Sequence, residues 1–504
     1  MSGFSSPTLG AYLIPVRIHP PHSAQFALLF ALLCPPMLYG SDTPRSTLER
    51  FKAKIEGALP GKAKDLEIGI AVQSLGNGDW LYEKDADTKL IPASVSKVFT
   101  SFTALKRLKP TAVFSTRVYA TGTVKDGLLT GDVYLRGGGD PSLTSERMWM
   151  LVNELKRSGI KTIQGNMIAD SSYFDEEKNP ASRPKYLRDQ AYNAPVGALS
   201  FNFNTTTIFV RPSETPGERP IVFTDPENSY IDVVNQAITG RANSSNTLNV
   251  SRTNFVEGDL GDTVLLKGSI PADEKEQRIY RNIVNPALYT LHMFKTFWEA
   301  RGLKFTGTTK EGTVPPGARL LLEFDSMPVW HVVWGMNKFS NNFVADQLLK
   351  KVGAEVQGAP GSIEKGLAAM KDVLSEVGIK AGEYEISDGS GLTRETRVTA
   401  RQVVKVLRAG HKDFGMMPEF LASFGIAGED GTLRNRLAKE DLQGQLRGKT
   451  GSIDGVAALA GYVPTASGEL VAFAVLFNDR RMKLGRLTPW IDRIATAVQG
   501  FTRR

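Results

Sequence analysis

The chain has 504 residues and a formal net charge of +8 at pH 7, and this length predicts two or three domains rather than one compact core. Hydrophobic residues make up 41% and charged residues 23%, which excludes a disordered chain. No run of about 18 apolar residues follows residue 50, which excludes an internal membrane-spanning helix, and a single cysteine, Cys34, excludes disulfide frameworks, cysteine-zinc sites and thiol catalysis from the rest of the chain.

The first 40 residues predict an export signal. Arg17 precedes the apolar run 24–33, and small residues follow it. A short buried helix is the alternative, but the Pro35-Pro36 pair would end it. We therefore expect a periplasmic or cell-envelope protein with no stable membrane anchor. A basic exported protein suits an anionic envelope polymer. Nucleic acid is not expected as a partner, because no lysine-arginine stripe alternates with aromatic residues.

After the signal, the sequence predicts a short helix and then a sheet element. The helix is expected over 46–59, followed by a hairpin over 66–82 with a Gly-Asn-Gly turn. The next segment, 93–108, carries apolar residues at helical spacing. From about 112 to 280 the pattern changes to short alternating strands separated by Gly, Asn and Pro, which predicts one or two β-rich modules.

The last third of the chain returns to helices. Helical patterns are expected to dominate from about 286 to 437, and a second hairpin follows over 456–478. A final amphipathic helix over 489–501 is expected to pack onto the sheet rather than to anchor the chain in a membrane.

The first chemical motif is Ser94 and Lys97, three residues apart at the start of a predicted helix. This spacing puts both side chains on one face, so the amine can reach the serine oxygen. A helix N-terminus also favours a developing oxyanion. For Lys97 to act as a base its pKa must fall, and both burial and a neighbouring cation would lower it. The motif alone is weak, because helix-start serines are common.

Two further motifs carry similar residue types. Lys449, Thr450 and Gly451 precede an apolar strand, where a cation and a hydroxyl can lie at a sheet edge and the Ser452 N–H can point into a cleft. The plain alternative is a turn before a strand. Ser340 and Asn342 precede a predicted helix; Ser340 is either an N-cap or a proton relay, and Asn342 can bind a substrate amide.

These three motifs, in this order, are typical of penicillin-binding proteins and β-lactamases. The sequence resembles the D-alanyl-D-alanine carboxypeptidase/endopeptidase family, the low-molecular-mass class C penicillin-binding proteins. Further matching stretches are LRGGGDPSLT (135–144), APVGALSFNFN (194–204), DGSGLTR (388–394) and AGEDGTLRNRL (427–437). The long interval between Ser94 and Ser340 also fits this family better than β-lactamases. The resemblance covers nearly all of the chain after the signal.

The resemblance implies an α+β fold, in which a transpeptidase-like domain with an antiparallel sheet and helices is split by β-rich insertions. We expect a signal at 1–40, the split catalytic domain at 41–111 and 281–504, and the insertion at 112–280. No metal or organic cofactor is implied. The isolated histidines are expected to be structural.

The resemblance also implies the reaction of a serine DD-peptidase on peptidoglycan stem peptides, with β-lactams as covalent inhibitors. Ser94 would attack the penultimate D-alanine carbonyl and Lys97 would take its proton. Lys449 and Thr450 would bind the terminal carboxylate, and Ser340 would relay a proton. Asn342 would hold the substrate amide, and the Ser94 and Ser452 N–H groups would hold the oxyanion. Trimming of the terminal D-alanine and cleavage of crosslinks both remain open.

Two charged residues in family-like loops are weaker candidates. Asp170 and Arg394 could hold the far end of a diaminopimelate side chain, or they could be solvated loop charges. Asp388 is expected to form a turn rather than to act in catalysis. A β-lactamase is one rival function, but no Glu-x-x-Leu-Asn stretch supplies a deacylation base. A non-catalytic wall-binding or β-lactam-sensing protein is another, and the complete set of serines and lysines argues against it.

Overall fold

The computed structural model describes residues 44–61, 66–184, 187, 189–252, 261–438, 442–481 and 484–503. The predicted export signal lies outside these residues. Within the described chain, no helix is both long enough and apolar enough to cross a membrane.

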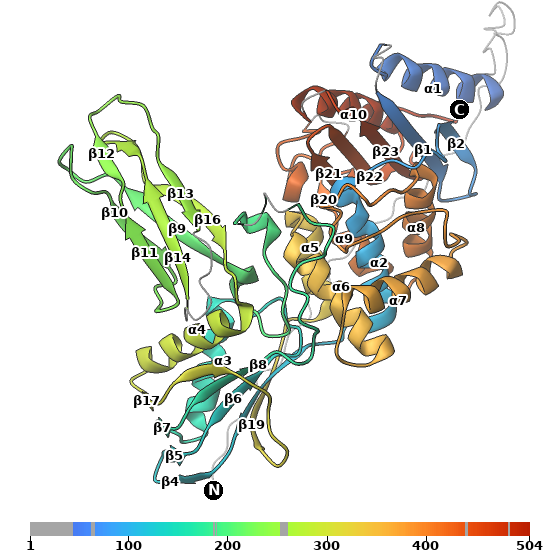
Figure 1. Ribbon diagram of the computed structural model, residues 1–504. Coiled ribbons are helices and arrows are strands. Elements are labelled where there is room, and N and C mark those ends of the chain that lie inside the picture. Colours follow the sequence, from blue (N-terminus) through green and yellow to red (C-terminus); the bar gives the residue numbers. More distant parts are fainter. Residues whose placement is uncertain are drawn as a thin grey trace, which may run out of the picture. The chain divides into compact units, whose positions relative to one another are not determined.

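Six of the described strands form one antiparallel sheet in the order β2-β1-β23-β22-β21-β20 (Figure 1). Both predicted hairpins are confirmed, because β1 pairs with β2 and β22 with β23. The short β20 pairs only with Arg447 and Gly448. The strands are β1 (Glu67–Ser74), β2 (Trp80–Lys84), β20 (Gly425–Ile426), β21 (Arg447–Ile453), β22 (Val456–Pro464) and β23 (Leu470–Asn478).

The two faces of this sheet are covered by different helices. On β23, Phe473 and Val475 pack with α1 (Pro44–Ala58) and α10 (Leu484–Gln499). The alternate residues Ala472 and Ala474 face the opposite core, as the two-residue period of a strand requires. The final helix packs on the sheet as expected, but it begins at Leu484, so Pro489 lies inside it rather than at its start.

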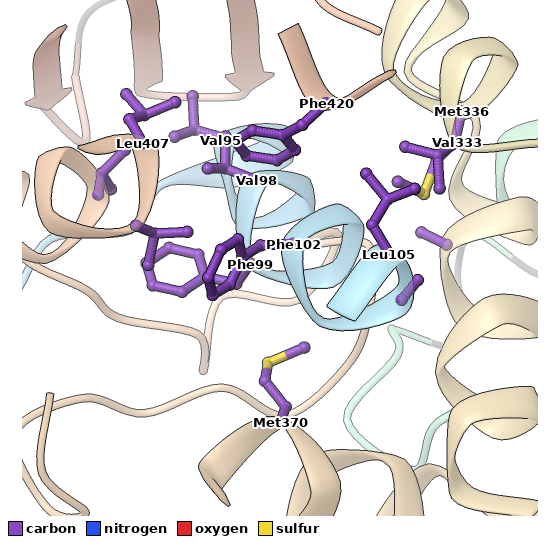
Figure 2. Close-up of a cluster of buried hydrophobic side chains, with 14 of the residues drawn as sticks. Val95, Val98, Phe99, Phe102, Leu105, Val333, Met336, Met370, Leu407 and Phe420 are labelled. Atoms are coloured by element: carbon purple, nitrogen blue, oxygen red, sulfur yellow. The ribbon is translucent and has the colours of Figure 1, made fainter. Parts of the chain in front are cut away.

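The opposite face carries the helix that follows the first motif. The predicted helix 93–108 forms as a 3-10 turn, η1 (Ala93–Ser96), followed by α2 (Lys97–Leu108). Its apolar stripe, including Val98, Phe102 and Leu105, lies in a fully buried cluster with side chains of the surrounding helices (Figure 2). Those helices are α5 (Val329–Phe339), α6 (Asn342–Gln357), α7 (Ile363–Glu376), α8 (Ala400–Lys412) and α9 (Met417–Ala422). The cluster fixes the position of the first residue of α2, Lys97.

The segment between α2 and α5 forms smaller sheets around a second core (Figure 1). One sheet has the order β18-β8-β6-β3-β19 and another the order β17-β7-β5-β4. Their strands are β3 (Ser115–Ala120), β4 (Thr123–Lys125), β5 (Leu128–Thr130), β6 (Val133–Arg136), β7 (Thr162–Gln164), β8 (Met167–Asp170), β17 (Lys304–Thr306), β18 (Thr309–Glu311) and β19 (Arg319–Asp325).

Three further small sheets lie in the same segment, in the orders β10-β9-β16, β11-β14-β13 and β12-β15. They contain β9 (Thr205–Arg211), β10 (Ile221–Asp225), β11 (Ile231–Asn235), β12 (Ile238–Gly240), β13 (Asn249–Arg252), β14 (Asp262–Lys267), β15 (Ser269–Pro271) and β16 (Gln277–Asn282). Two helices complete the segment, α3 (Ser145–Arg157) and α4 (Pro286–Ala300).

Two details of this segment differ from the sequence prediction. Helix α3 was not expected among the strands, and β17, β18 and β19 lie where helices were expected. The leucine run of β19 has no clear period, and its pairing with β3 decides its conformation. The domain division stays a prediction, but these pairings favour a second boundary near 326 rather than 281, because β17–β19 complete sheets begun by the inserted strands.

Candidate active site

The three sequence motifs come together in the structure. Ser94 lies in η1, Ser340 lies between α5 and α6, and Lys449 lies on β21. The Lys97 Nζ is 3.0 Å from Ser94 Oγ and 2.7 Å from Asn342 Oδ1. The Lys449 Nζ is 2.9 Å from Ser340 Oγ. The five predicted catalytic side chains therefore form two sets of contacts, Lys97 with Ser94 and Asn342, and Lys449 with Ser340, and the second motif takes part in both.

The corner between α5 and α6 places the second motif. Ser340 ends α5 in the left-handed conformation, with φ of 56°. Asn341, not Ser340, caps α6, because its side chain accepts a hydrogen bond from the Val344 N–H at 3.1 Å. The N-cap alternative for Ser340 is therefore wrong, and its hydroxyl accepts a hydrogen bond from Lys449 instead.

A glycine brings the third motif beside the first. A Cβ on Gly451 would lie 2.3 Å from the Pro92 carbonyl oxygen and 3.2 Å from the Val95 nitrogen. Only glycine allows β21 to approach η1 so closely. The exposed Ser452 is the next residue of β21. The end of this strand therefore lies beside the turn that carries Ser94.

Lys97 is fully buried, whereas Ser94 is half-buried. Burial is the main cause that lowers the pKa of the Lys97 amine to about 7. The carboxylates of Asp346 and Asp388 act in the opposite direction, and the positive charge of Arg183 lowers the pKa further. A large fraction of the amine is therefore neutral near pH 7.

The partners of Lys97 orient the neutral amine. Its Nζ is 2.7 Å from the Ser390 carbonyl oxygen as well as from Asn342 Oδ1. The Asn342 amide is fixed because its Nδ2 donates to the Tyr192 carbonyl at 2.8 Å. Both oxygens near Nζ can only accept, so they take the two N–H groups of the neutral amine. The remaining lone pair then faces the Ser94 hydroxyl.

The third motif forms the opposite side of the group. Burial, together with the positive charge of Lys97, lowers the pKa of Lys449 well below its usual value. The Lys449 Nζ also donates to the Thr450 carbonyl at 2.9 Å. The Thr450 hydroxyl donates to Thr432 Oγ1 at 2.7 Å. A carboxylate bound beside these groups would favour the ammonium form of Lys449.

The two weaker candidates lie apart from this group. Arg394 is exposed and donates a hydrogen bond to the Asp454 carbonyl in the turn after β21. It lines a cavity of about 1050 Å³ together with Arg397 and Arg480.

Asp170 is only 1% exposed, and its own neighbours satisfy it. Its carboxylate accepts hydrogen bonds from the N–H groups of Ser172 and Val314, each at 2.9 Å, and lies 3.7 Å from Arg136. The structure therefore does not bring Asp170 to the group around Ser94, and the expectation that it contacts substrate is not supported.

Sequence reasoning missed several groups that complete the site. Thr432 and the Ser390 carbonyl lie in stretches that matched the family, and that match was their only signal. The Tyr192 carbonyl and Arg183 had no signal. Asp388 forms a turn, as expected, by accepting hydrogen bonds from two backbone N–H groups of its own loop.

Two further observations concern metals and histidines. Over the described ranges, no three residues of the types His, Cys, Asp and Glu gather in a group that could hold a metal ion. The buried His292 lies between the hydroxyls of Ser229 and Thr309, at 3.0 and 3.2 Å. Burial lowers the pKa of this imidazole.

The fold has a close counterpart among solved structures. Penicillin binding protein 4 (dacB) from Haemophilus influenzae aligns with a TM-score of 0.78 and 25% identity, covering 89% of this chain and 99% of that chain. The same protein complexed with a novel β-lactam aligns with a TM-score of 0.72 over the same shares. The molecule thus has the α+β fold of a penicillin-binding protein with several additional sheets, and the predicted fold class is confirmed.

Sequence comparison gives the family. Residues 52–495 match the D-Ala-D-Ala carboxypeptidase 3 (S13) family. The D-alanyl-D-alanine carboxypeptidase of Actinomadura sp. (strain R39) is 33% identical over 474 residues, which are 90% of this chain and 86% of that protein. The chain belongs to the D-Ala-D-Ala carboxypeptidase 3 (S13) family and is a serine D-Ala-D-Ala carboxypeptidase. The predicted family and enzyme class are therefore confirmed.

Proposed function

We propose that this carboxypeptidase cleaves the stem peptides of peptidoglycan through an acyl-enzyme on Ser94. The observation that carries the proposal is the arrangement around Lys97, whose lone pair faces a half-buried serine hydroxyl while its N–H groups are held by two acceptors. A buried neutral amine at this distance is suited to take a proton from serine. The predicted export signal supports action in the periplasm or cell envelope, where this polymer lies.

The reaction has two halves. Ser94 Oγ attacks the carbonyl carbon of the penultimate D-alanine, and its proton passes to Lys97. The bond to the last D-alanine breaks, and the proton held by Lys97 passes to the leaving amine through Ser340, which lies beside Lys449, so that the lysine is neutral again. Water then hydrolyses the serine ester and regenerates the hydroxyl.

Binding groups are assigned to the same site. Lys449 and Thr450 bind the terminal carboxylate, and Asn342 binds the acyl-side amide. The N–H groups of Ser94 and Ser452 hold the oxyanion, which the close approach of β21 to η1 supports. Arg394 is proposed to bind the diaminopimelate side chain; its exposure and its position in the cavity at the turn between β21 and β22 support this role.

We further propose that β-lactams acylate Ser94, because a β-lactam presents an acyl group and a carboxylate as D-Ala-D-Ala does. The structural similarity to a homologue complexed with a β-lactam supports this inhibition.

Digestion of purified sacculi tests the function. Mass spectrometry of the products should detect free D-alanine from pentapeptides, or separated crosslinks, or both. A fluorescent penicillin should label the parent protein once, on the peptide that contains Ser94. Ser94→Ala should lose labelling and cleavage while its thermal unfolding stays close to that of the parent. An adduct on another residue, or cleavage by Ser94→Ala, would contradict the assignment.

A further inference from the structure

Beneath Lys97 lies a group of buried charges that no motif includes. The side chains of Arg183, Asp346 and Asp388 are 3%, 1% and 0% exposed. Asp346 lies on α6, four residues after Asn342, and Asp388 lies in the loop before α8. Arg183 comes from the segment between β8 and β9. Three distant parts of the chain thus meet behind the proposed base.

The two carboxylates shape the loop that holds the Ser390 carbonyl. Asp388 accepts hydrogen bonds from the N–H groups of Ser390 and Gly391, at 3.1 and 2.6 Å. Asp346 accepts one from the Gly389 N–H at 2.9 Å. Because the Ser390 carbonyl takes an N–H of Lys97, both carboxylates influence the orientation of the amine as well as its charge.

Arg183 joins both carboxylates. Its Nη2 donates to Asp346 and, at 3.0 Å, to the Ser390 hydroxyl. Its Nε lies 3.6 Å from Asp388. Its Nη1 donates to Asn193 Oδ1 at 2.9 Å. One guanidinium from outside the motifs therefore contacts two residues of the loop under Lys97, Asp388 and Ser390.

The same segment also reaches the other partner of the amine. Tyr192, next to Asn193, provides the carbonyl that fixes the Asn342 amide. Residues of 183–193 thus contact Ser390, which carries one acceptor of the Lys97 N–H groups, and the Asn342 amide, which carries the other. This stretch contains no catalytic motif.

We propose that Arg183 is a positioning residue for Lys97. Its charge partly balances the two carboxylates and so keeps the amine available to accept the Ser94 proton. Its hydrogen bonds keep the Ser390 carbonyl in place. This inference rests on the proposed role of Lys97 as the base.

The charges that face Lys97 come from four elements: Asp346 on α6, Asp388 in its loop, Arg183 from the inserted segment and Lys449 on β21. Burial raises the pKa of Asp346 to about 6, so two carboxylates and one guanidinium leave one net negative charge from the buried group above that pH. The carboxylates raise the pKa of Lys97 and Arg183 lowers it. Removing a positive or a negative charge should therefore move that pKa in opposite directions.

The test is the pH profile of acylation by a fluorescent penicillin, measured as a second-order rate constant. Where Asp346 is ionised, Arg183→Gln leaves two net negative charges, so the midpoint of the rising limb should move up, by as much as about one pH unit. The rate at pH 7 should fall by up to about fivefold, and it should recover at higher pH. Asp346→Asn should move the midpoint down. The double variant restores one net negative charge, and its midpoint should return toward that of the parent.

Control variants separate positioning from folding. Arg436→Gln removes a less buried arginine–aspartate ion pair, that with Asp492, and it should leave the midpoint unchanged. Arg183→Lys keeps the charge and should keep the midpoint with a lower plateau. If Arg183→Gln does not fold, the downward shift of Asp346→Asn still tests the charge argument.

Opposite shifts and recovery in the double variant support the proposal. Lower plateaus with unchanged midpoints would overturn it. A purely structural role lowers the maximum acylation rate without changing the pH at which the rate is half maximal. Failure of the proposed function is distinguishable, because the parent would then not be acylated at Ser94 at all.

Discussion

The catalytic region and the inserted segment both supply groups around Lys97, but they supply different kinds of group. The region of the six-stranded sheet contributes the side chains that we propose to react, those of Ser94, Ser340 and Lys449, each within a motif of three or four residues. The inserted segment contributes Arg183 and the Tyr192 carbonyl, which contact the partners of the reacting groups. The comparison teaches that part of the support for the proposed reacting groups is coded outside the region that carries the motifs.

The largest expected effects follow from substitution of the two lysines of the catalytic region. Lys97→Arg should lower penicillin acylation by about a thousandfold, the scale of general-base catalysis, because guanidinium does not release its proton near neutral pH. Lys449→Arg should lose only about tenfold, since it needs only to supply charge to a carboxylate. Stopped-flow acylation measures both. Equal losses would refute the division of roles.

The pKa of Lys97 predicts how the acylation rate of the parent protein depends on pH. Burial lowers the pKa of Lys97 to about 7, so the neutral, reactive amine is lost as the pH falls below that value. Acylation should be about a hundredfold slower at pH 5 than on its plateau above pH 8. A flat profile across this range would show that Lys97 does not titrate in the reaction.

A substitution at Gly451 tests the position of β21 without removing any functional side chain. Gly451→Ala would place a Cβ 2.3 Å from the Pro92 carbonyl oxygen and push β21 away from η1. Acylation should fall by about a hundredfold, because a displacement of about 1 Å disturbs the reacting geometry. Gly485→Ala is the control: its Cβ meets no atom within 4 Å, so the rate should be that of the parent. A parent-like rate for Gly451→Ala would mean that the strand position is not critical.

Arg394 separates substrate recognition from the reaction itself. Arg394→Ala should leave penicillin acylation near normal, but cleavage of diaminopimelate-containing peptides should fall about tenfold, the worth of one charge-assisted hydrogen bond. Liquid chromatography of the cleaved peptides measures this loss. A matched peptide with alanine in place of diaminopimelate should be cleaved by parent and variant alike. Equal losses on both peptides would instead indicate a role in holding the Asp454 turn.

The smallest effect on activity is expected in the inserted region. Asp170→Ala should leave acylation and peptide cleavage unchanged, because its carboxylate is buried and satisfied by Ser172 and Val314. The free energy of unfolding should fall by about 1–3 kcal/mol, because two buried N–H groups lose their acceptor. Urea denaturation measures this change, with Asp170→Asn as the milder control. A selective loss on diaminopimelate peptides would restore the substrate-binding role.

The difference between the regions also explains what the sequence could predict. Ser94 and Lys97 share one turn, and the residues of the other two motifs are adjacent or nearly so, so local spacing indicates their chemistry. Both hairpins and helix α2 followed from their periodicity. The family match then predicted that the motifs meet.

The remaining groups depend on contacts that no local pattern records. Arg183 reaches Asp346 across 163 residues and Ser390 across 207, and the Tyr192 carbonyl acts through its backbone, which any residue could provide. Strand β19 was missed for a related reason, because its pairing with β3, and not its own leucines, sets its conformation. The burial of Asp170 could not be predicted either, because a charged residue in a family-like loop resembles a ligand until its contacts are known.

The long separations within the site have a consequence for synthesis of the protein. Lys97 contacts Asn342 across 245 residues and Ser390 across 293, and Lys449 comes later still. Contacts between residues so far apart in the sequence form late in folding, after much of the chain has already folded. A nascent chain that carries Ser94 therefore has no acylation site until almost all of its residues have been made. Penicillin labelling should then report completed molecules and ignore fragments that end before β21.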